Sequence, residues 1–183
     1  MPSIKVGYRD HALLPMVDVV PSKRPFALDT NVFVNALAGR APAELRTLLA
    51  NLPLSFVSAS TIAELSWTLG RLDPDHSQTS AVVGKIEAVR ARIAPGKILV
   101  PSADQWAAAG ILAGRAARAI SGEVRSIKTA FDRIGLMNDA VTATVAAAIG
   151  ATVVTKDRDF DLFSSWSRRS TWFSMTELPI DYL

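Results

Sequence analysis

The stretch Pro25-Phe26-Ala27-Leu28-Asp29-Thr30-Asn31 places a short apolar run directly before three polar residues. Residues 32–37 then carry apolar side chains at helical spacing, so the sequence predicts a strand, a polar turn and a helix. The pattern returns at residues 54–59 (LSFVSA), where Ser60 and Thr61 open a helix that we expect to end at Gly70. Strands that are apolar throughout and separated by helices favour the α/β class, with a parallel sheet covered on both faces.

Further helices and strands are expected along the rest of the chain. Helices are predicted over residues 43–52, 77–93, 103–120, 138–149 and 160–163, and strands over 151–154 and 171–176. The helix at 138–149 is expected to be capped by Asn138 and ended by Gly150. Residues 1–24 hold three prolines and little periodicity, so we expect an N-terminal extension before a domain that spans residues 25–183.

The composition restricts the chemistry that the chain can perform. A chain of 183 residues with 49% hydrophobic and 20% charged residues is long enough to bury a core. It contains no cysteine, which excludes disulfides, thiolate nucleophiles and iron–sulfur clusters. Only two histidines are present, so a zinc site of several imidazoles is not expected. Carboxylates remain, and carboxylate oxygens suit hard ions such as Mg²⁺ or Mn²⁺.

The net charge of +3 is small, but the basic residues are unevenly distributed. Residues 90–133 contain eight lysines and arginines against three acids, which indicates either a phosphate-bearing partner or a solvated helix face. The first residues lack the pattern of a signal peptide, and the longest apolar run, residues 140–154, is shorter than the roughly 18–20 residues of a spanning helix. We therefore expect a cytoplasmic protein without a membrane segment.

Four acids are expected at the carboxyl edge of the sheet. Asp29 and Asp157 follow two strands, while Glu64 and Asp139 would lie early on helices that flank the same edge. Each has a purely structural alternative: Thr61 to Glu64 matches a capping box, Asp139 would suit a helix N-terminus, and Asp29 or Asp157 could cap a helix. Two such charges about 5 Å apart repel by roughly 3 kcal/mol, so a bound cation or protonation must offset the repulsion.

Four motifs together resemble a known family. They are FALDTN at residues 26–31, STIAE at 60–64, NDA at 138–140 and VTKDRDF at 154–160. In order and spacing they look like the PIN-domain ribonucleases, and most of all like the VapC-type toxins of toxin–antitoxin pairs. The resemblance implies a Rossmann-like parallel sheet of about five strands with helices on both faces. It also implies an endoribonuclease that uses Mg²⁺ or Mn²⁺, commonly forms a homodimer, and is silenced by a small antitoxin protein.

The resemblance also implies roles for individual residues. Asp29 and Asp139 match the firmest metal ligands, and Glu64 and Asp157 match the third and fourth acids of the catalytic set. Supporting roles fall to Asn31, Thr155 and Asp159. Contacts with RNA are expected from four basic residues: Lys128, Arg133, Lys156 and Arg158.

Two other functions fit parts of the pattern. A phosphatase of the haloacid dehalogenase kind also begins from an Asp at the end of its first strand, but it prefers a second Asp where this chain has Asn31. A PIN-shaped module could instead bind RNA or a partner without cutting. Retention of all four acids argues against such a module, because a binder of polyanions would gain by losing them.

Overall fold

The computed structural model describes residues 25–37, 39–40, 55–121, 130–167 and 180–182. Within these residues a parallel sheet of five strands has the order β3-β2-β1-β4-β5. The strands are β1 (Phe26–Leu28), β2 (Ser55–Ser58), β3 (Ile98–Leu99), β4 (Thr152–Thr155) and β5 (Ile180–Tyr182). The helices are α1 (Thr30–Leu37), α3 (Ala59–Gly70), α4 (Thr79–Arg90), α5 (Ala103–Ser121), α6 (Ala130–Ala148) and α7 (Asp159–Ser167), and a 3₁₀ turn covers Pro95–Lys97.

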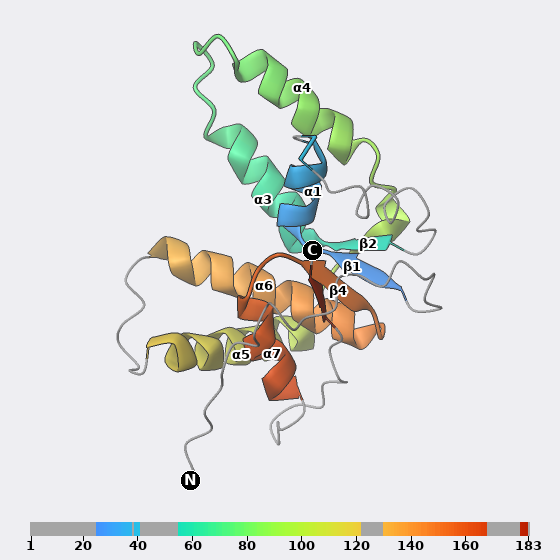
Figure 1. Ribbon diagram of the computed structural model, residues 1–183, viewed down its shortest axis with the longest axis vertical. Helices are drawn as coiled ribbons and strands as arrows, with labels where there is room; N and C mark the ends of the chain where they lie inside the picture. The colour runs from blue at the N-terminus through green and yellow to red at the C-terminus, as the bar shows by residue number, and fades with distance from the viewer. Residues whose placement is uncertain (1–24, 38, 41–54, 122–129, 168–179, 183) are drawn as a thin grey trace.

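The strand order reverses between β1 and β4. The chain runs outward from β1 through β2 to β3, and then returns to place β4 on the other side of β1, with β5 beyond it. Figure 1 shows α1, α3 and α4 above the sheet and α5, α6 and α7 below it. Such a reversal leaves a crevice at the carboxyl ends of the two central strands, which is where α/β sheets bind their ligands.

The main core lies between the sheet and the three lower helices. Helix α5 packs along α6 through small side chains, and Leu112 and Val141 are fully buried in this layer. Phe160 and Phe163 of α7 meet edge to face, with ring centroids 5.6 Å apart, and both are completely buried. This packing fixes α6 and α7 against β1 and β4, and so fixes the acids that these helices carry.

A second, smaller core joins α3 to α4. Leu65 of α3 and Ile86 and Val89 of α4 are buried together, and the two helices extend away from the sheet (Figure 1). Among the described residues, no helix combines the length and the apolar character required to cross a membrane.

Most of the expected elements are confirmed. Strands β1, β2 and β4 and helices α3, α4, α5 and α7 lie where the sequence predicted them, with ends shifted by up to four residues. Gly150 has a φ of 65°, which suits the glycine that follows helix α6. The predicted helix over 43–52 and strand over 171–176 lie outside the described residues, as does the extension 1–24. Strands β3 and β5 were not predicted.

Candidate active site

Asp29 lies at the carboxyl end of β1, where its carboxylate is held by three donors. Its backbone N–H donates to the carbonyl of Val154 on β4 at 3.1 Å, so the residue extends the pairing of the two strands. The hydroxyl of Thr155 donates to Asp29 Oδ2 at 2.6 Å, and the backbone N–H of Thr30 donates to Oδ1 at 2.6 Å. The third donor is the Asn31 amide, which reaches Oδ2 at 2.5 Å.

Asn31 connects the ends of the two central strands. Its amide nitrogen also donates to Thr155 Oγ1 at 3.2 Å, and its amide oxygen accepts the backbone N–H of Lys156 at 3.3 Å. Asp29, Asn31 and Thr155 therefore form one hydrogen-bonded unit across β1 and β4. Because Asp29 is only 5% exposed, this unit fixes the orientation of its carboxylate.

Asp139, Asp157 and Asp159 form a cluster of carboxylates beside this unit. One oxygen from each lies within 4.8 Å of the other two. Asp157 Oδ1 also accepts the backbone N–H of Asp159 at 2.8 Å. Asp157 therefore supports the start of α7, as its structural alternative predicted, and belongs to the cluster as well. Its own N–H donates to Thr155 Oγ1 at 2.8 Å, which ties the cluster to the Asp29 unit.

The position of Asp139 differs from the prediction. Helix α6 begins at Ala130, so Asn138 and Asp139 lie in its middle, and Asn138 does not cap the helix. The predicted helix start at Asn138 was wrong because Asn is typical of helix caps, whereas here its side chain forms a hydrogen bond with a residue of another helix. The helix dipole therefore gives no reason for an acid at position 139, because its effect is limited to the end turns.

Glu64 also lies deeper in its helix than expected. Helix α3 begins at Ala59, and Ser58 is its cap, accepting the N–H of Ser60 at 3.2 Å, so the capping box from Thr61 to Glu64 is wrong. Glu64 is instead in the second turn, where Asn138 Nδ2 donates to its Oε1 at 2.7 Å. This hydrogen bond positions Glu64 from α6, one residue before Asp139.

Buried hydroxyls fix α3 against α6. Ser60 Oγ lies 2.8 Å from Ser58 Oγ and 3.1 Å from Thr142 Oγ1, and it donates to the carbonyl of Asn138 at 3.2 Å. Ser58, Ser60 and Thr142 are all buried. The separation of Glu64 from Asp139 thus depends on a polar contact between helices that are distant in the sequence.

Two acids of the site, Asp29 and Asp139, are destabilised in their charged forms. Burial raises the pKa of Asp29 to about 6, despite the opposing hydrogen bonds from Thr155 and Thr30, and the charges of Glu64 and Asp157 add to the rise. Burial also raises the pKa of Asp139 well above its ordinary value, and the charges of four acids raise it further: Asp29, Asp157, Glu64 and Asp159. In the described part of the chain, no lysine or arginine forms an ion pair with Asp29, Glu64, Asp139 or Asp157.

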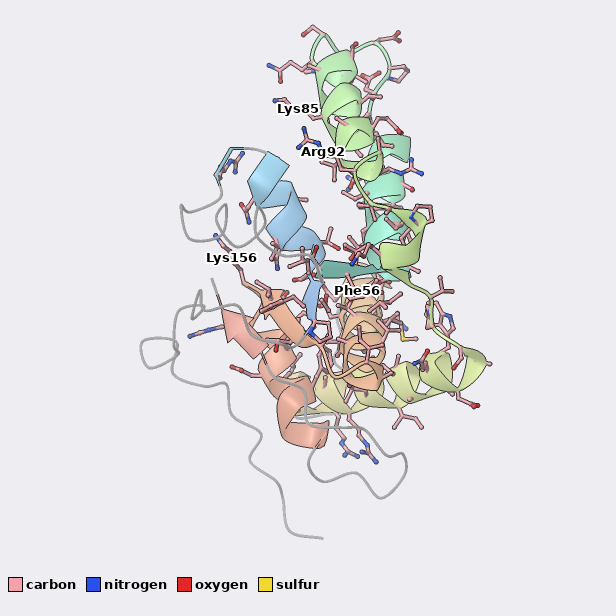
Figure 2. All side chains as sticks on the ribbon, turned by 90° about the vertical axis from the view of Figure 1, so that its right-hand side faces the viewer. Phe56, Lys85, Arg92 and Lys156 are labelled. Carbon is pink, nitrogen blue, oxygen red and sulfur yellow. The ribbon has the colours of Figure 1, made fainter. Side chains whose placement is uncertain are left out.

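The described basic residues of the stretch 90–133 lie on both sides of the sheet. Arg90 is in α4, above the sheet, whereas Arg115 and Arg118 of α5 and Arg133 of α6 lie below it (Figure 1). In Figure 2 Lys85 and Arg92 lie on and just beyond α4, while Lys156 lies lower, close to the end of β4. Lys156 and Arg158 are exposed on either side of Asp157 in the sequence, Arg133 is exposed on α6, and Lys128 lies outside the described residues.

Trp67 was not predicted to lie in this region. It lies three residues after Glu64 on α3 and lines a pocket that Glu64 also lines. The spacing was the available signal, because residues three apart share a helix face.

Comparison with known proteins identifies the family of this chain. The family model described as PIN domain matches residues 26–164, which include every acid of the site. The chain belongs to the PIN domain family. A search of curated proteins gave no match.

Solved structures with the same fold include complexes of other PIN proteins. VapBC2 of Rickettsia felis bound to promoter DNA is 20% identical, covering 86% of this chain and 98% of that one, with a TM-score of 0.51. FitAcB of Neisseria gonorrhoeae is 21% identical over 85% and 96% of the two chains, with a TM-score of 0.55. DNA-bound VapBC of Salmonella typhimurium is 18% identical over 87% and 98%, with a TM-score of 0.53. These similarities establish the PIN fold, a parallel α/β sheet with helices.

Proposed function

We propose that this PIN protein is a metal-dependent endoribonuclease and the toxin of a toxin–antitoxin pair. One observation carries the proposal: the buried Asp29 and the half-buried Asp139 both have a raised pKa, although they come from segments 110 residues apart. Burying carboxylates close together costs free energy, and a protein does so where the charge is used. Membership of the PIN family supports a nuclease, and it does not support the haloacid dehalogenase alternative.

The donor set fits Mg²⁺ or Mn²⁺. All the candidate ligands are carboxylate oxygens, and one oxygen from each of Asp139, Asp157 and Asp159 already lies within 4.8 Å of the other two. We assign Asp29, Asp139, Glu64 and Asp157 as the residues that would hold the ion, with Asp159 beside them. When bound, the ion would supply an activated water and neutralise charge that develops on the phosphate.

The other residues act by holding these acids and the substrate. Asn31 and Thr155 fix the orientation of the Asp29 carboxylate, and Asn138 fixes that of Glu64. Lys156 and Arg158 are exposed beside Asp157, where they can bind the phosphates that flank the hydrolysed bond. Arg133 and Lys128 are assigned to more distant backbone contacts.

The similarity to VapBC and FitAB complexes supports the proposed partners. We assign to this chain a small antitoxin protein that covers the acidic site, and a homodimer as its own assembly, acting in the cytoplasm. The nuclease domain is taken as residues 25–183, and residues 1–24 as an extension that precedes it.

The activity is tested by incubating structured and single-stranded RNA with the protein, with Mn²⁺ or with a chelator. We expect cleavage only with Mn²⁺, and a loss of at least about 100-fold in Asp29→Asn and Asp139→Asn. Asp104→Asn is the matched control, because Asp104 is exposed on α5. RNA binding without cleavage by the wild type would favour the binding module, and growth arrest relieved by an adjacent small gene product would establish the toxin.

A further inference from the structure

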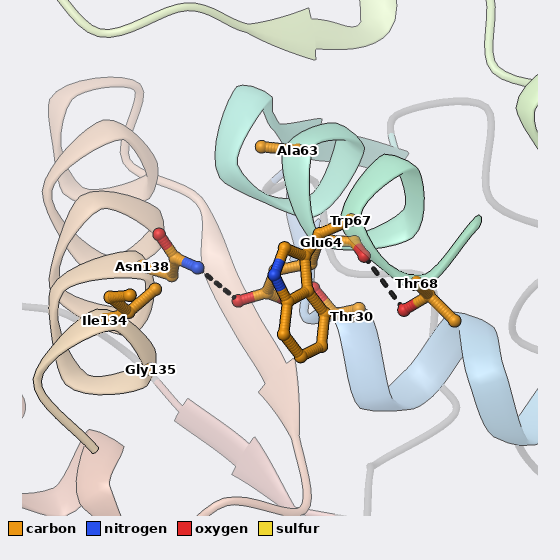
Figure 3. A pocket seen from close by; sticks show the side chains of 8 residues that line it. All are labelled: Thr30, Ala63, Glu64, Trp67, Thr68, Ile134, Gly135 and Asn138. Carbon is orange, nitrogen blue, oxygen red and sulfur yellow. Dashed lines mark hydrogen bonds between the residues drawn. The ribbon is translucent and has the colours of Figure 1, made fainter. Parts of the chain in front are cut away.

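A pocket of about 430 Å³ lies between α3 and α6, beside the acidic site. Trp67 and Ala63 line it from α3, and Ile134 and Gly135 line it from α6. Its polar lining consists of Glu64, Asn138, Thr30 and Thr68. Figure 3 shows the indole of Trp67 on the α3 side and Ile134 on the α6 side, with the hydrogen bond between Asn138 and Glu64 joining the two helices. The indole is 48% exposed and Ile134 is 60% exposed, so the pocket opens to solvent.

We propose that this pocket receives one unstacked nucleobase of the RNA, which stacks on the indole of Trp67. The inference rests on the proposed function and adds a subsite to it. The base belongs to a nucleotide next to the bond that is hydrolysed.

The location of the pocket supports this assignment. Glu64 lines the pocket and also raises the pKa of both Asp29 and Asp139, so its carboxylate belongs to the pocket and to the acidic site at once. Asn138 lines the pocket one residue before Asp139. A group bound here is therefore adjacent to a phosphate held at the acids, which is the position of a neighbouring base.

The chemistry of the lining favours a base over a phosphate. The carboxylate of Glu64 would repel a phosphate, whereas an indole and aliphatic side chains favour a flat, weakly polar ring. Amide and carboxylate groups are the side chains that bond to base edges, and Asn138 and Glu64 supply one of each. The volume suits a single nucleotide, since small-ligand pockets fall between about 300 and 1,000 Å³.

Arg71 completes the arrangement. Its guanidinium lies 4.5 Å from the centroid of the Trp67 ring, so it supports the indole as a stacking platform. Arg71 is exposed, so its charge is available to a phosphate of a nucleotide that stacks on Trp67.

The test measures binding of a fluorescent single-stranded RNA octamer of mixed sequence, by anisotropy and with metal chelated. We expect Trp67→Ala to weaken binding about 5- to 100-fold and Trp67→Phe to retain most of it, because stacking needs an aromatic face. Trp106→Ala is the matched control, since Trp106 is 46% exposed on α5, and its affinity should equal that of the wild type. A series of octamers, each with one abasic nucleotide at a different position, is then compared. One abasic position should weaken binding to the wild type, and the same position should not weaken binding to Trp67→Ala any further.

Equal affinity of Trp67→Ala and wild type, an abasic effect that adds to that of the substitution, or no binding by the wild type would overturn the proposal. A change of oligomeric state in Trp67→Ala without a change in RNA affinity would also overturn it, because a protein surface would then cover the pocket. Cleavage with Mn²⁺ is measured separately. Binding that depends on Trp67 without cleavage contradicts the proposed function alone, whereas cleavage with unchanged RNA affinity in Trp67→Ala contradicts the subsite alone.

Discussion

Thr155 donates a 2.6 Å hydrogen bond to Asp29, a residue 126 positions earlier in the chain. The contact exists because β1 and β4 pair in parallel, with Leu28 beside Val154, so the residues that follow the two strands meet at one edge. The hydroxyl opposes the effect of burial on the pKa of Asp29. The pairing of β1 with β4 thus affects the pKa of Asp29, the acid that we place at the centre of the site.

Replacing Thr155 with valine tests this relationship. Thr155→Val keeps the shape of the buried side chain but removes the donor, so the pKa of Asp29 should rise further above its value of about 6. A hydrogen bond to a charged group contributes about 1.5–3 kcal/mol, which corresponds to a shift of about one to two pH units. The acid limb of the pH–rate profile for RNA cleavage should move upward by this amount. Thr155→Ser keeps the hydroxyl and should leave the limb in place; an unmoved limb in Thr155→Val would exclude the coupling.

The raised pKa values predict how stability changes with pH. A carboxyl whose pKa is higher in the folded state binds protons more tightly when folded, so it lowers the free energy of unfolding as pH rises from about 4 upward. For Asp29, a rise from 3.8 to about 6 corresponds to a loss on the order of 3 kcal/mol by neutral pH. Urea denaturation of the metal-free protein should therefore give lower stability at pH 7.5 than at pH 5.

Two comparisons separate this effect from other titrations. Asp139→Asn removes an acid with a raised pKa, so it should make the metal-free protein more stable at pH 7.5 and change little at pH 4. Mn²⁺ should stabilise the wild type more at pH 7.5 than at pH 5, because the acids are then charged. A wild-type protein that gains stability steadily from pH 5 to 7.5 without metal would contradict the cluster.

Asn138 provides a test of how Glu64 is held. Asn138→Ala removes the 2.7 Å hydrogen bond to Glu64 Oε1, and groups that orient ligands typically account for 10- to 100-fold in metal affinity. We expect Mn²⁺ binding, measured by calorimetry, to weaken by at least about tenfold. Stability should change by less than about 1 kcal/mol, because alanine favours the helix interior. Thr144→Ala is the control: it removes a hydrogen bond within the same helix, to the carbonyl of Ala140, and should leave Mn²⁺ affinity unchanged.

Ser60 tests the junction between α3 and α6. Ser60→Ala removes a hydroxyl that contacts Ser58, Thr142 and the carbonyl of Asn138, so buried polar groups lose a partner. Such losses destabilise by about 1–3 kcal/mol, and cleavage should fall as Glu64 moves relative to Asp139. The exposed Ser66, whose hydroxyl bonds within α3, gives the control Ser66→Ala, with a change below about 0.5 kcal/mol. Equal stability of the two variants in chemical denaturation would contradict this role.

The central strands and the meeting of their acids could be predicted from the sequence, because both depend on local patterns. The apolar run Phe26–Leu28 is followed directly by Asp29, and the β-branched run Thr152–Thr155 is followed by Lys156 and Asp157. Once β1 and β4 are neighbours, Asp29 and Asp157 must lie at the same edge. Strand β5 was missed because three residues carry too little pattern, and it forms by pairing with β4.

The errors at Asn138 and Glu64 have a common physical cause. Asn, Ser and Thr favour helix starts because their side chains form hydrogen bonds with the nearby backbone. A prediction from sequence therefore assigns these side chains to helix caps. Here Asn138 donates a hydrogen bond to Glu64, 74 residues away, and Ser60 donates one to the carbonyl of Asn138 on α6. These polar residues lie inside helices and make hydrogen bonds between the two helices. The Trp67 pocket depends on the same contact between helices; the sequence indicated only that Trp67 and Glu64 share a face of α3, and not that α6 would lie opposite.

The proposed metal site is located directly by anomalous scattering from a crystal soaked in Mn²⁺. Our account predicts a peak between Asp29 and Asp139, next to Asp157, that disappears in Asp139→Asn crystals. A fully occupied Mn²⁺ peak elsewhere on the protein, with none at these acids, would contradict it.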